Sequence, residues 1–300
     1  MSRIHEHSEF GTSSVKAGEL WYSEYHAVDV CLSFEAEPLA WEKTPFQQLN
    51  FYRNQSYGVF FTLNGYVQLT ARDEFIYHDM IVHPAMAVNP DIRRVLIIGG
   101  GDGGTAREVA RYPQVEQIDL VEIDEAVIRL SRQYLPQTAA VFDHEPRLKV
   151  WIGDGVEFVR KAKPDAYDLI LVDSTDPVGP GEGLFTTHFY QDCYRILSEQ
   201  GIMINQQEGA FFDQDIWEMQ RAHRKVKAVF PISRVYGFNM PTYASGYWYF
   251  GFASKGLDPL ANQQAERWQA LGIATKYYNS DVHGASFVLP NYVREILMTV

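Results

Sequence analysis

Apolar and polar residues alternate along the chain in two different ways, and the change falls near residue 72. Before it, short runs of aromatic and β-branched residues such as "YGVFFTLNG" are interrupted by polar residues, a pattern typical of antiparallel strands. The pair Asn64-Gly65 has the chemistry of a hairpin turn between two of these strands. Residues 1–72 are therefore predicted to form a small N-terminal antiparallel β domain.

After residue 72, strongly apolar runs alternate with segments of helical spacing. The run "RVLIIGGG" is followed by "TAREVARY", "QIDLVEID" by "EAVIRLSRQYL", "LKVWIGDG" by "VEFVRKA", and "YDLILVDS" closes the series. This alternation predicts an α/β fold over residues 73–300, a Rossmann-like, doubly wound, mostly parallel sheet. In such a sheet ligands bind beyond the carboxyl ends of the strands, so the loops after the strands should carry the function.

Composition and charge exclude several classes of function. No apolar run reaches the roughly 18 residues of a membrane span, and the N-terminus lacks a signal-peptide pattern, so a cytoplasmic protein is expected. The net charge of −12, with basic blocks no larger than pairs such as Arg93-Arg94, argues against nucleic acid and favours a cationic small molecule. Cys31 and Cys193 belong to no spaced cluster. His223 falls on an apolar helical stripe and is expected in the core.

The loop after the first parallel strand, Gly99 to Gly104, contains the pattern G-x-G-x-x-G. Its glycines allow a ligand to approach the backbone where the next helix begins, which suits both dinucleotides and adenosyl-sulfonium compounds. Asp102 within the loop would oppose a pyrophosphate but would attract a cationic group. The purely structural alternative is a tight turn with an N-cap aspartate.

The next two strand ends carry acids suited to an adenosyl group. Glu122 can accept hydrogen bonds from ribose hydroxyls, whereas Asp124 is expected to cap the following helix. Asp154 can accept from an adenine amino group, and Gly155 leaves room for the ring. An isolated Asp-Gly pair is usually only a turn. Three such loops in succession nevertheless favour an adenosyl ligand.

The fourth strand ends in "VDSTDPVGPGEGLF", which places Asp173 and Asp176 in a loop of prolines and glycines. This composition suits a lid that holds acids at set positions while its backbone closes over a ligand. A metal site is the competing interpretation. Since no histidine or cysteine lies nearby in the sequence and no calcium-loop spacing is present, no metal is expected.

These four loops, together with "LNGYVQLTARDEFIYHDM", "PTYASGYW" and "YYNSDVHGASFVLP", resemble the polyamine aminopropyltransferases, above all the spermidine synthases, over nearly the whole chain. The resemblance implies an N-terminal β domain that makes homodimer or homotetramer contacts. It also implies transfer of the aminopropyl group of decarboxylated S-adenosylmethionine to putrescine, which leaves methylthioadenosine. The chain has "LNG", "YHDM" and "PTYAS" where this family commonly has "LDG", "YHEM" and "PTYPS".

The resemblance further implies a role for individual residues. Asp173 is the implied proton acceptor. The implied cofactor positions are Gln47, His78, Asp102, Glu122, Asp154, Gly155 and Pro180. The substrate positions are Tyr77, His78, Asp102, Asp173, Ser174, Thr175, Asp176 and Tyr243, to which Gln68 and Trp248 are added as a hydrogen-bonding and an aromatic candidate for the amine channel.

The chemistry makes one demand of these residues. A primary amine has a pKa near that of lysine, about 10.4, so its free form costs roughly 4–5 kcal/mol at pH 7. Asp173 is the candidate base, and Tyr77 and Tyr243 would orient the amine. Neighbouring cations should lower the pKa of Asp173, so we expect desolvation under the closed loop to raise its basicity.

Other functions remain open from the sequence. A methyltransferase using ordinary S-adenosylmethionine could share the first three loops, although the carboxylate of that cofactor would be repelled by Asp102 and the acidic fourth loop. A non-catalytic polyamine-binding protein could keep the fold, and a nicotinamide-dependent oxidoreductase could use the glycine loop. The acceptor also stays open among putrescine, cadaverine, agmatine and spermidine, because a few pocket side chains decide between them.

Overall fold

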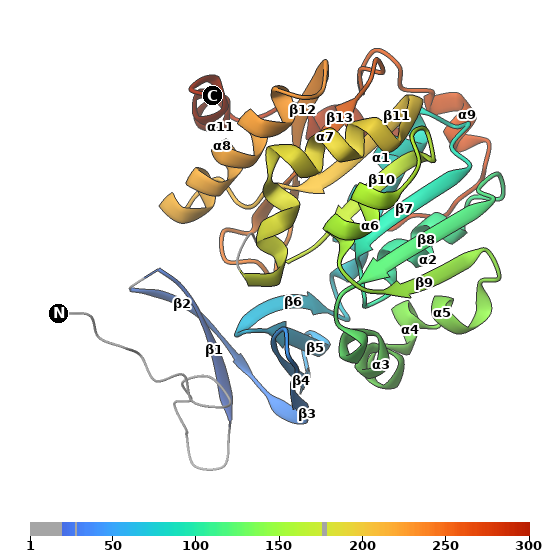
Figure 1. Cartoon of the computed structure of the whole chain (residues 1–300). Helices are drawn as coiled ribbons and strands as arrows, with labels where there is room; N and C mark the ends of the chain where they lie inside the picture. Colours follow the sequence, from blue (N-terminus) through green and yellow to red (C-terminus); the bar gives the residue numbers. More distant parts are fainter. Residues whose placement is uncertain (1–19, 28, 176–178) are drawn as a thin grey trace.

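The computed structural model describes residues 20–27, 29–175 and 179–300, and its central element is a seven-stranded sheet in the order β12-β13-β11-β10-β7-β8-β9 (Figure 1). The strands are β7 (Arg94–Gly99), β8 (Gln117–Glu122), β9 (Leu148–Ile152), β10 (Tyr167–Asp173), β11 (Leu197–Gln206), β12 (Ile232–Asn239) and β13 (Tyr247–Ser254). Strands β9, β8, β7, β10 and β11 are parallel, whereas β13 runs antiparallel to β11 and β12. The chain progresses in opposite directions across the sheet on either side of β7 and β10, which makes their carboxyl ends the expected ligand site.

Helices cover both faces of this sheet, as Figure 1 shows, which confirms the predicted doubly wound fold. They are α1 (Glu74–Val88), α2 (Gly104–Ala110), α3 (Glu125–Tyr134), α4 (Pro136–Ala139), α5 (Val141–His144), α6 (Gly155–Lys161), the 3₁₀ helix η1 (Gly179–Phe185), α7 (Thr187–Ile196), α8 (Asp213–Lys227), α9 (Ala265–Gln269), α10 (Ser280–Ser286) and α11 (Asn291–Met298). Val95 and Ile97 of β7 pack into the core shared with α1 and α2. Leu96 and Ile98 point the other way, into the core shared with α6, α7 and α8. Because both faces are buried, the strands appear in the sequence as continuous apolar runs.

The N-terminal part of the chain forms an antiparallel sheet in the order β3-β4-β5-β6 and a separate hairpin β1-β2. Its strands are β1 (Trp21–Ala27), β2 (Val30–Glu35), β3 (Glu37–Lys43), β4 (Gln48–Asn54), β5 (Gly58–Leu63) and β6 (Tyr66–Thr70). Phe51 belongs to a buried cluster with Val127 of α3, so one face of the small sheet packs on the larger domain. Phe60 on the other face packs with Tyr22 of the hairpin.

Several local predictions can be compared with this fold. Asn64 and Gly65 have φ values of 49° and 89°, so they form the expected left-handed turn between β5 and β6. His223 is buried in α8, where burial and the charge of Lys227 lower its pKa to about 4, as expected for a neutral core histidine. Within the described ranges, no helix is long and apolar enough to cross a bilayer.

Candidate active site

A cavity lies where the loops after β7, β8, β9 and β10 face β6, α1 and the turn between β12 and β13. The predicted site residues on its wall are Gln47, Gln68, Tyr77, His78, Asp102, Glu122, Asp154, Gly155, Asp173, Ser174, Thr175, Tyr243 and Trp248. Pro180 lies within η1, next to Gly181 on the cavity wall. Asp176 lies outside the described residues. The fold thus brings together side chains that are up to 201 positions apart, from Gln47 to Trp248.

The glycine loop lets the ends of β7, β8 and β10 converge. Gly99 has a left-handed φ of 84°, and a Cβ atom there would lie 2.0 Å from the carbonyl oxygen of Asp173. The backbone N–H of Gly100 donates to that same carbonyl at 2.9 Å. A Cβ atom at Gly101 would lie 2.9 Å from Oε2 of Glu122. Side chains at these positions would therefore push the acidic residues apart.

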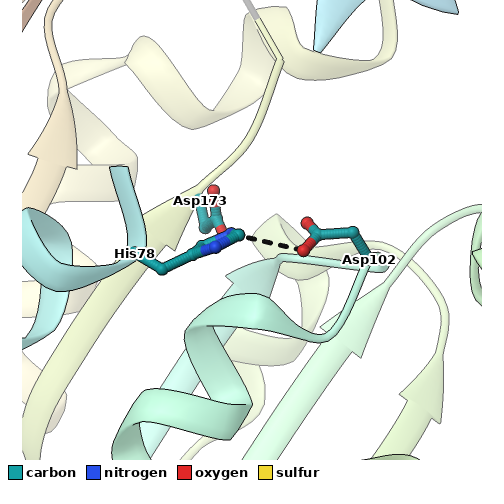
Figure 2. Close-up of side chains that lie close together, drawn as sticks. All are labelled: His78, Asp102 and Asp173. Atoms are coloured by element: carbon teal, nitrogen blue, oxygen red, sulfur yellow. Dashed lines mark ion pairs between the residues drawn. The ribbon is translucent and has the colours of Figure 1, made fainter. Parts of the chain in front are cut away.

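Helix α1 places His78 between two carboxylates. Its Nδ1 lies 2.5 Å from Oε2 of Glu74, and its Nε2 lies 3.2 Å from Oδ1 of Asp102. Figure 2 shows His78 and Asp102 joined by this second contact, with Asp173 beside them. Burial alone would lower the pKa of His78, but the charges and hydrogen bonds of Asp102 and Glu74 outweigh it and raise the pKa to about 10. His78 is therefore an imidazolium at neutral pH.

Arg107 of α2 completes this group of charges. Its Nη1 and Nη2 atoms donate to the two carboxylate oxygens of Glu74 at 3.0 and 2.9 Å. Burial would raise the pKa of Glu74, but hydrogen bonds and charges from His78 and Arg107 lower it to about 2. Glu74 thus remains ionised and holds His78 in place. Glu74 was not among the predicted site residues, because a glutamate in the first turn of a helix is explained by the helix dipole alone.

Asp102 therefore has an internal cation as its partner, beyond the substrate cation expected from the sequence. Burial would raise the pKa of Asp102, but His78 lowers it below the ordinary value. Its Oδ1 also accepts from the backbone N–H of Gly104 at 2.8 Å, but the N-cap position of α2 is Gly103, so Asp102 is not the N-cap aspartate considered as the structural alternative. Gly104 lies so close to His78 that its Cβ atom would be 2.0 Å from the imidazole.

Asp173 stands at the end of β10, and its Oδ2 accepts from the hydroxyl of Thr105 at 2.6 Å. Burial and the negative charge of Asp102 raise its pKa to about 6, against the opposing charge of His78. Burial of Asp173 by the fold thus raises its pKa, an effect that was expected to come from closure of the loop over the ligand. Burial, followed by the charge of Asp173, raises the pKa of Tyr77 well above its ordinary value, so this phenol stays protonated and can donate.

Among the residues predicted to bind the adenosyl group, Glu122 is buried at the end of β8, and its Oε1 accepts from the backbone N–H of Asp124 at 2.9 Å. Burial raises the pKa of Glu122 to about 7. Asp124 caps α3 by accepting from Ala126 N at 3.1 Å, which confirms the expected cap. The side chain of Gln47, the residue before β4, donates to Asp124 at 3.1 Å, which links the N-terminal part of the chain to the same strand end.

The loop after β9 has a similar construction. Asp154 caps α6, and its Oδ1 accepts from the backbone N–H of Val156 at 2.8 Å. A Cβ atom at Gly155 would lie 2.5 Å from Cγ2 of Ile98, so this position must be glycine for the loop to lie flat against β7. Glycine here serves packing, and Gly155 also lines the cavity.

Aromatic and amide side chains line the opposite end of the cavity. The hydroxyl of Tyr243 donates to the backbone carbonyl of Gln68 at 2.9 Å, while the Gln68 side chain bonds to the carbonyl of Tyr66. The Trp248 ring lies 4.6 Å from that of Tyr243, and its Nε1 donates to Gln206 at 3.1 Å. Aromatic rings and amide groups at this end suit an alkyl chain that ends in a cation.

Two polar residues that were not predicted, Gln206 and Glu208, also line the cavity. Gln206 ends β11, and its Nε2 donates to Oε1 of Glu208 at 2.9 Å. Glu208 is buried, has a left-handed φ of 67° and lines the cavity. Gln206 is the last residue of the fifth parallel strand and Glu208 lies two residues beyond it, in "NQQEG", so the rule applied to the first four strand ends would have found them.

The ligand atoms of His78, Asp102 and Asp173 lie within 4.8 Å of one another, a spacing that a metal ion could use. The contacts already described account for this cluster without one. Both ring nitrogens of His78 face carboxylates, and Asp173 accepts from Thr105. The arrangement can hold a cationic ligand beside Asp102 while Asp173 accepts a proton.

Comparisons with known proteins agree with this chemistry. A family model described as the spermine/spermidine synthase domain matches residues 74–264. A polyamine aminopropyltransferase of Clostridium acetobutylicum is 58% identical over 276 residues, which cover 92% of this chain and 96% of the relative. The polyamine aminopropyltransferase of Clostridioides difficile is 51% identical over 280 residues, or 93% of this chain and 99% of the relative.

Solved structures give the same result. A crystal structure of spermidine synthase in complex with the transition state analogue AdoDATO superposes with a TM-score of 0.90 at 43% identity, covering 94% of this chain and 96% of that one. Spermidine synthase from Thermotoga maritima gives a TM-score of 0.89 at 42% identity, covering 94% and 95%. The resemblance found in the sequence motifs is thereby confirmed, and so is the fold.

Proposed function

The chain belongs to the spermine/spermidine synthase family of polyamine aminopropyltransferases, and from this premise we propose that it makes spermidine. It would transfer the aminopropyl group of decarboxylated S-adenosylmethionine to putrescine, giving spermidine and S-methyl-5'-thioadenosine. One observation carries the proposal. Asp173, a carboxylate whose pKa is raised to about 6, lines the same cavity as the acidic loops after β7, β8 and β9 and the aromatic residues Tyr243 and Trp248.

The residues present fit the proposed co-substrate. Glu122 would accept hydrogen bonds from the ribose, and Asp154 and Gly155 would receive the adenine. Asp102 would face the positively charged aminopropyl sulfonium portion. AdoDATO, the transition state analogue held by a similar spermidine synthase, supports an adenosyl ligand for this cavity. The co-substrate supplies an activated carbon next to a sulfonium, whose leaving thioether is neutral.

The chain's own residues would prepare the acceptor. The ammonium group of putrescine gives a proton to Asp173 as its nitrogen forms a C–N bond to the aminopropyl carbon and the C–S bond breaks. The product secondary amine stays protonated, and the proton on Asp173 passes to solvent. Because the pKa of Asp173 is nearer to that of the amine than an ordinary aspartate's, burial makes it the better base. Tyr77 and Tyr243 would orient the nitrogen.

Putrescine is the proposed acceptor over cadaverine, agmatine and spermidine. The Gln206–Glu208 pair would receive the far end of the chain, since Glu208 offers a charge for a second ammonium group. We further propose a cytoplasmic homodimer or homotetramer that assembles through the domain of residues 1–72. Light scattering after size-exclusion chromatography of the full chain and of a variant altered in this domain would test the assembly.

The test of the proposed function is a competition among acceptors. The protein is incubated with decarboxylated S-adenosylmethionine and equal amounts of putrescine, cadaverine, agmatine and spermidine, and the products are resolved by mass spectrometry. Spermidine and methylthioadenosine should dominate. If the dominant product came from another amine, the proposal that putrescine is the acceptor would be wrong, but the assignment as an aminopropyltransferase would stand. Formation of S-adenosylhomocysteine from ordinary S-adenosylmethionine would contradict the class itself.

A further inference from the structure

Asp73 stands at the N-cap of α1, yet its side chain does not cap the helix. An aspartate at this position ordinarily accepts from a backbone N–H of the first helical turn. Here Oδ1 accepts from the hydroxyl of Thr70 at 2.5 Å, and Oδ2 accepts from the backbone N–H of Thr242 at 3.1 Å and from the Thr242 hydroxyl. The carboxylate is thus committed to partners outside its own helix.

These contacts join three segments that each carry a cavity residue. Thr70 ends β6, two residues after Gln68, and Asp73 precedes α1, which carries Tyr77. Thr242 precedes Tyr243 in the turn between β12 and β13. The Tyr243 hydroxyl donates to the carbonyl of Gln68, so this turn is anchored to the β6–α1 junction at two points.

The hydrogen bonds that join Asp73 to Thr70 and Thr242 are buried, so water cannot readily replace them. Asp73 is 4% exposed, Thr70 is 0% exposed and Thr242 is 1% exposed. Hydrogen bonds to a buried carboxylate are among the stronger ones in proteins, and losing one leaves a buried charge poorly satisfied. A displacement of Thr242 would be transmitted directly to Tyr243, whose ring packs against Trp248 at 4.6 Å.

We propose that Asp73 and Thr242 are positioning residues that hold Tyr243 at the acceptor end of the cavity and thereby set the affinity for the amine. The inference rests on the proposed function, because that function assigns Tyr243 to the acceptor. Asp73 does not itself line the cavity, and its side chain bonds to Thr70 and Thr242. Its effect should therefore fall on the amine and spare the adenosyl side, where Glu122 and Asp154 belong to other loops.

The test compares Thr242→Val, which keeps the shape but loses the hydroxyl, with Thr242→Ser, which keeps the hydroxyl. Thr242→Val should raise KM for the amine about ten-fold and leave KM for decarboxylated S-adenosylmethionine within about two-fold, while Thr242→Ser stays near wild type. Melting temperature and the Kd for methylthioadenosine report whether each variant is folded. A fall in melting temperature with both KM values unchanged, or an equal rise of both, would overturn the inference.

A second variant keeps the test decisive if Thr242→Val does not fold. Asp73→Asn retains the size of the side chain but replaces one acceptor oxygen by a donor, and it should produce the same selective rise in KM for the amine. Unchanged selectivity in folded Asp73→Asn would overturn the inference. Failure of the proposed function looks different, since the wild-type protein itself would then show no turnover with any of the amines.

Discussion

The Nε2 atom of His78 lies 3.2 Å from Oδ1 of Asp102 in a buried part of the site. The opposite ring nitrogen faces Glu74 at 2.5 Å, so both nitrogens donate and the ring carries a positive charge. This ion pair determines the electrostatic surroundings of Asp173. After burial, Asp102 is the strongest influence that raises the pKa of Asp173, and His78 is the strongest charge that lowers it.

Asp102→Asn should therefore change the pH dependence of the reaction. At saturating decarboxylated S-adenosylmethionine, wild-type kcat/KM for the amine should fall as the pH drops through about 6, where Asp173 becomes protonated. Removing the negative charge of Asp102 lowers the pKa of Asp173, so the acid limb should move to lower pH by about one unit. Initial rates across the acid range would measure this shift. If the acid limb stayed in place or moved to higher pH, the charge of Asp102 would not be raising the pKa of Asp173.

His78 should make stability fall at alkaline pH. Its folded pKa of about 10 exceeds its ordinary value of 6.5, so its contribution is complete below pH 6.5 and is lost as the pH rises through about 10. Between these limits the free energy of unfolding should decline by at most about 1.4 kcal/mol per pH unit. Urea unfolding of wild type and of His78→Gln would show it as a difference in slope. If the free energy of unfolding changed with pH equally in the two proteins, the raised pKa of His78 would be contradicted.

Glu122 should make adenosyl binding depend on pH near neutrality. Burial raises its pKa to about 7, and only the ionised carboxylate accepts fully from ribose hydroxyls. The affinity for methylthioadenosine should thus rise as the pH increases through about 7, and Glu122→Gln should bind more weakly with no such rise. Asp154→Asn serves as the matched control, since it weakens adenine binding but keeps Glu122. Titration calorimetry with methylthioadenosine at several pH values around 7 would measure this dependence. If the affinity of Glu122→Gln still rose with pH, Glu122 would not be the group responsible.

The sequence identified the site because of where the motifs fall. Asp102, Glu122, Asp154 and Asp173 each follow an apolar run, and the carboxyl ends of parallel strands meet at one edge of the sheet. Their side chains therefore gather around one cavity even though the chain separates them. The Asn64-Gly65 turn and the Asp124 cap were predictable for a local reason, since each depends only on neighbouring backbone groups.

The charge states could not be predicted in this way. Asp102 and Glu74 raise the pKa of His78, and Arg107 helps to keep Glu74 ionised, but a helix surface pattern does not show which side chains face one another across α1 and α2. The raised pKa of Asp173 likewise depends on burial by the whole fold. The sequence motifs indicated which groups are present, whereas the three-dimensional packing determines their proton affinities.

Gly104→Ala should damage the site through packing alone. A Cβ atom at this position would lie between 2.0 and 2.4 Å from three atoms of the His78 imidazole, which is fixed by two carboxylates. Overpacking of this kind should cost about 1–3 kcal/mol of stability and reduce activity by displacing His78. Gly284→Ala is the control, because a Cβ atom in that part of α10 meets no heavy atom within 4 Å. Thermal unfolding of both variants separates the two effects, and equal melting temperatures would contradict the packing argument.

The most direct test of the account is the turnover of Asp173→Asn with decarboxylated S-adenosylmethionine and putrescine. Asparagine keeps the shape and the contact with Thr105 but cannot take up the proton. The rate should fall by about 10²- to 10⁴-fold while the Kd for methylthioadenosine changes by less than about two-fold. The exposed Asp143→Asn on α5 should behave as wild type. Near-normal turnover of Asp173→Asn from about pH 6 to pH 9 would contradict the assignment of Asp173 as the proton acceptor.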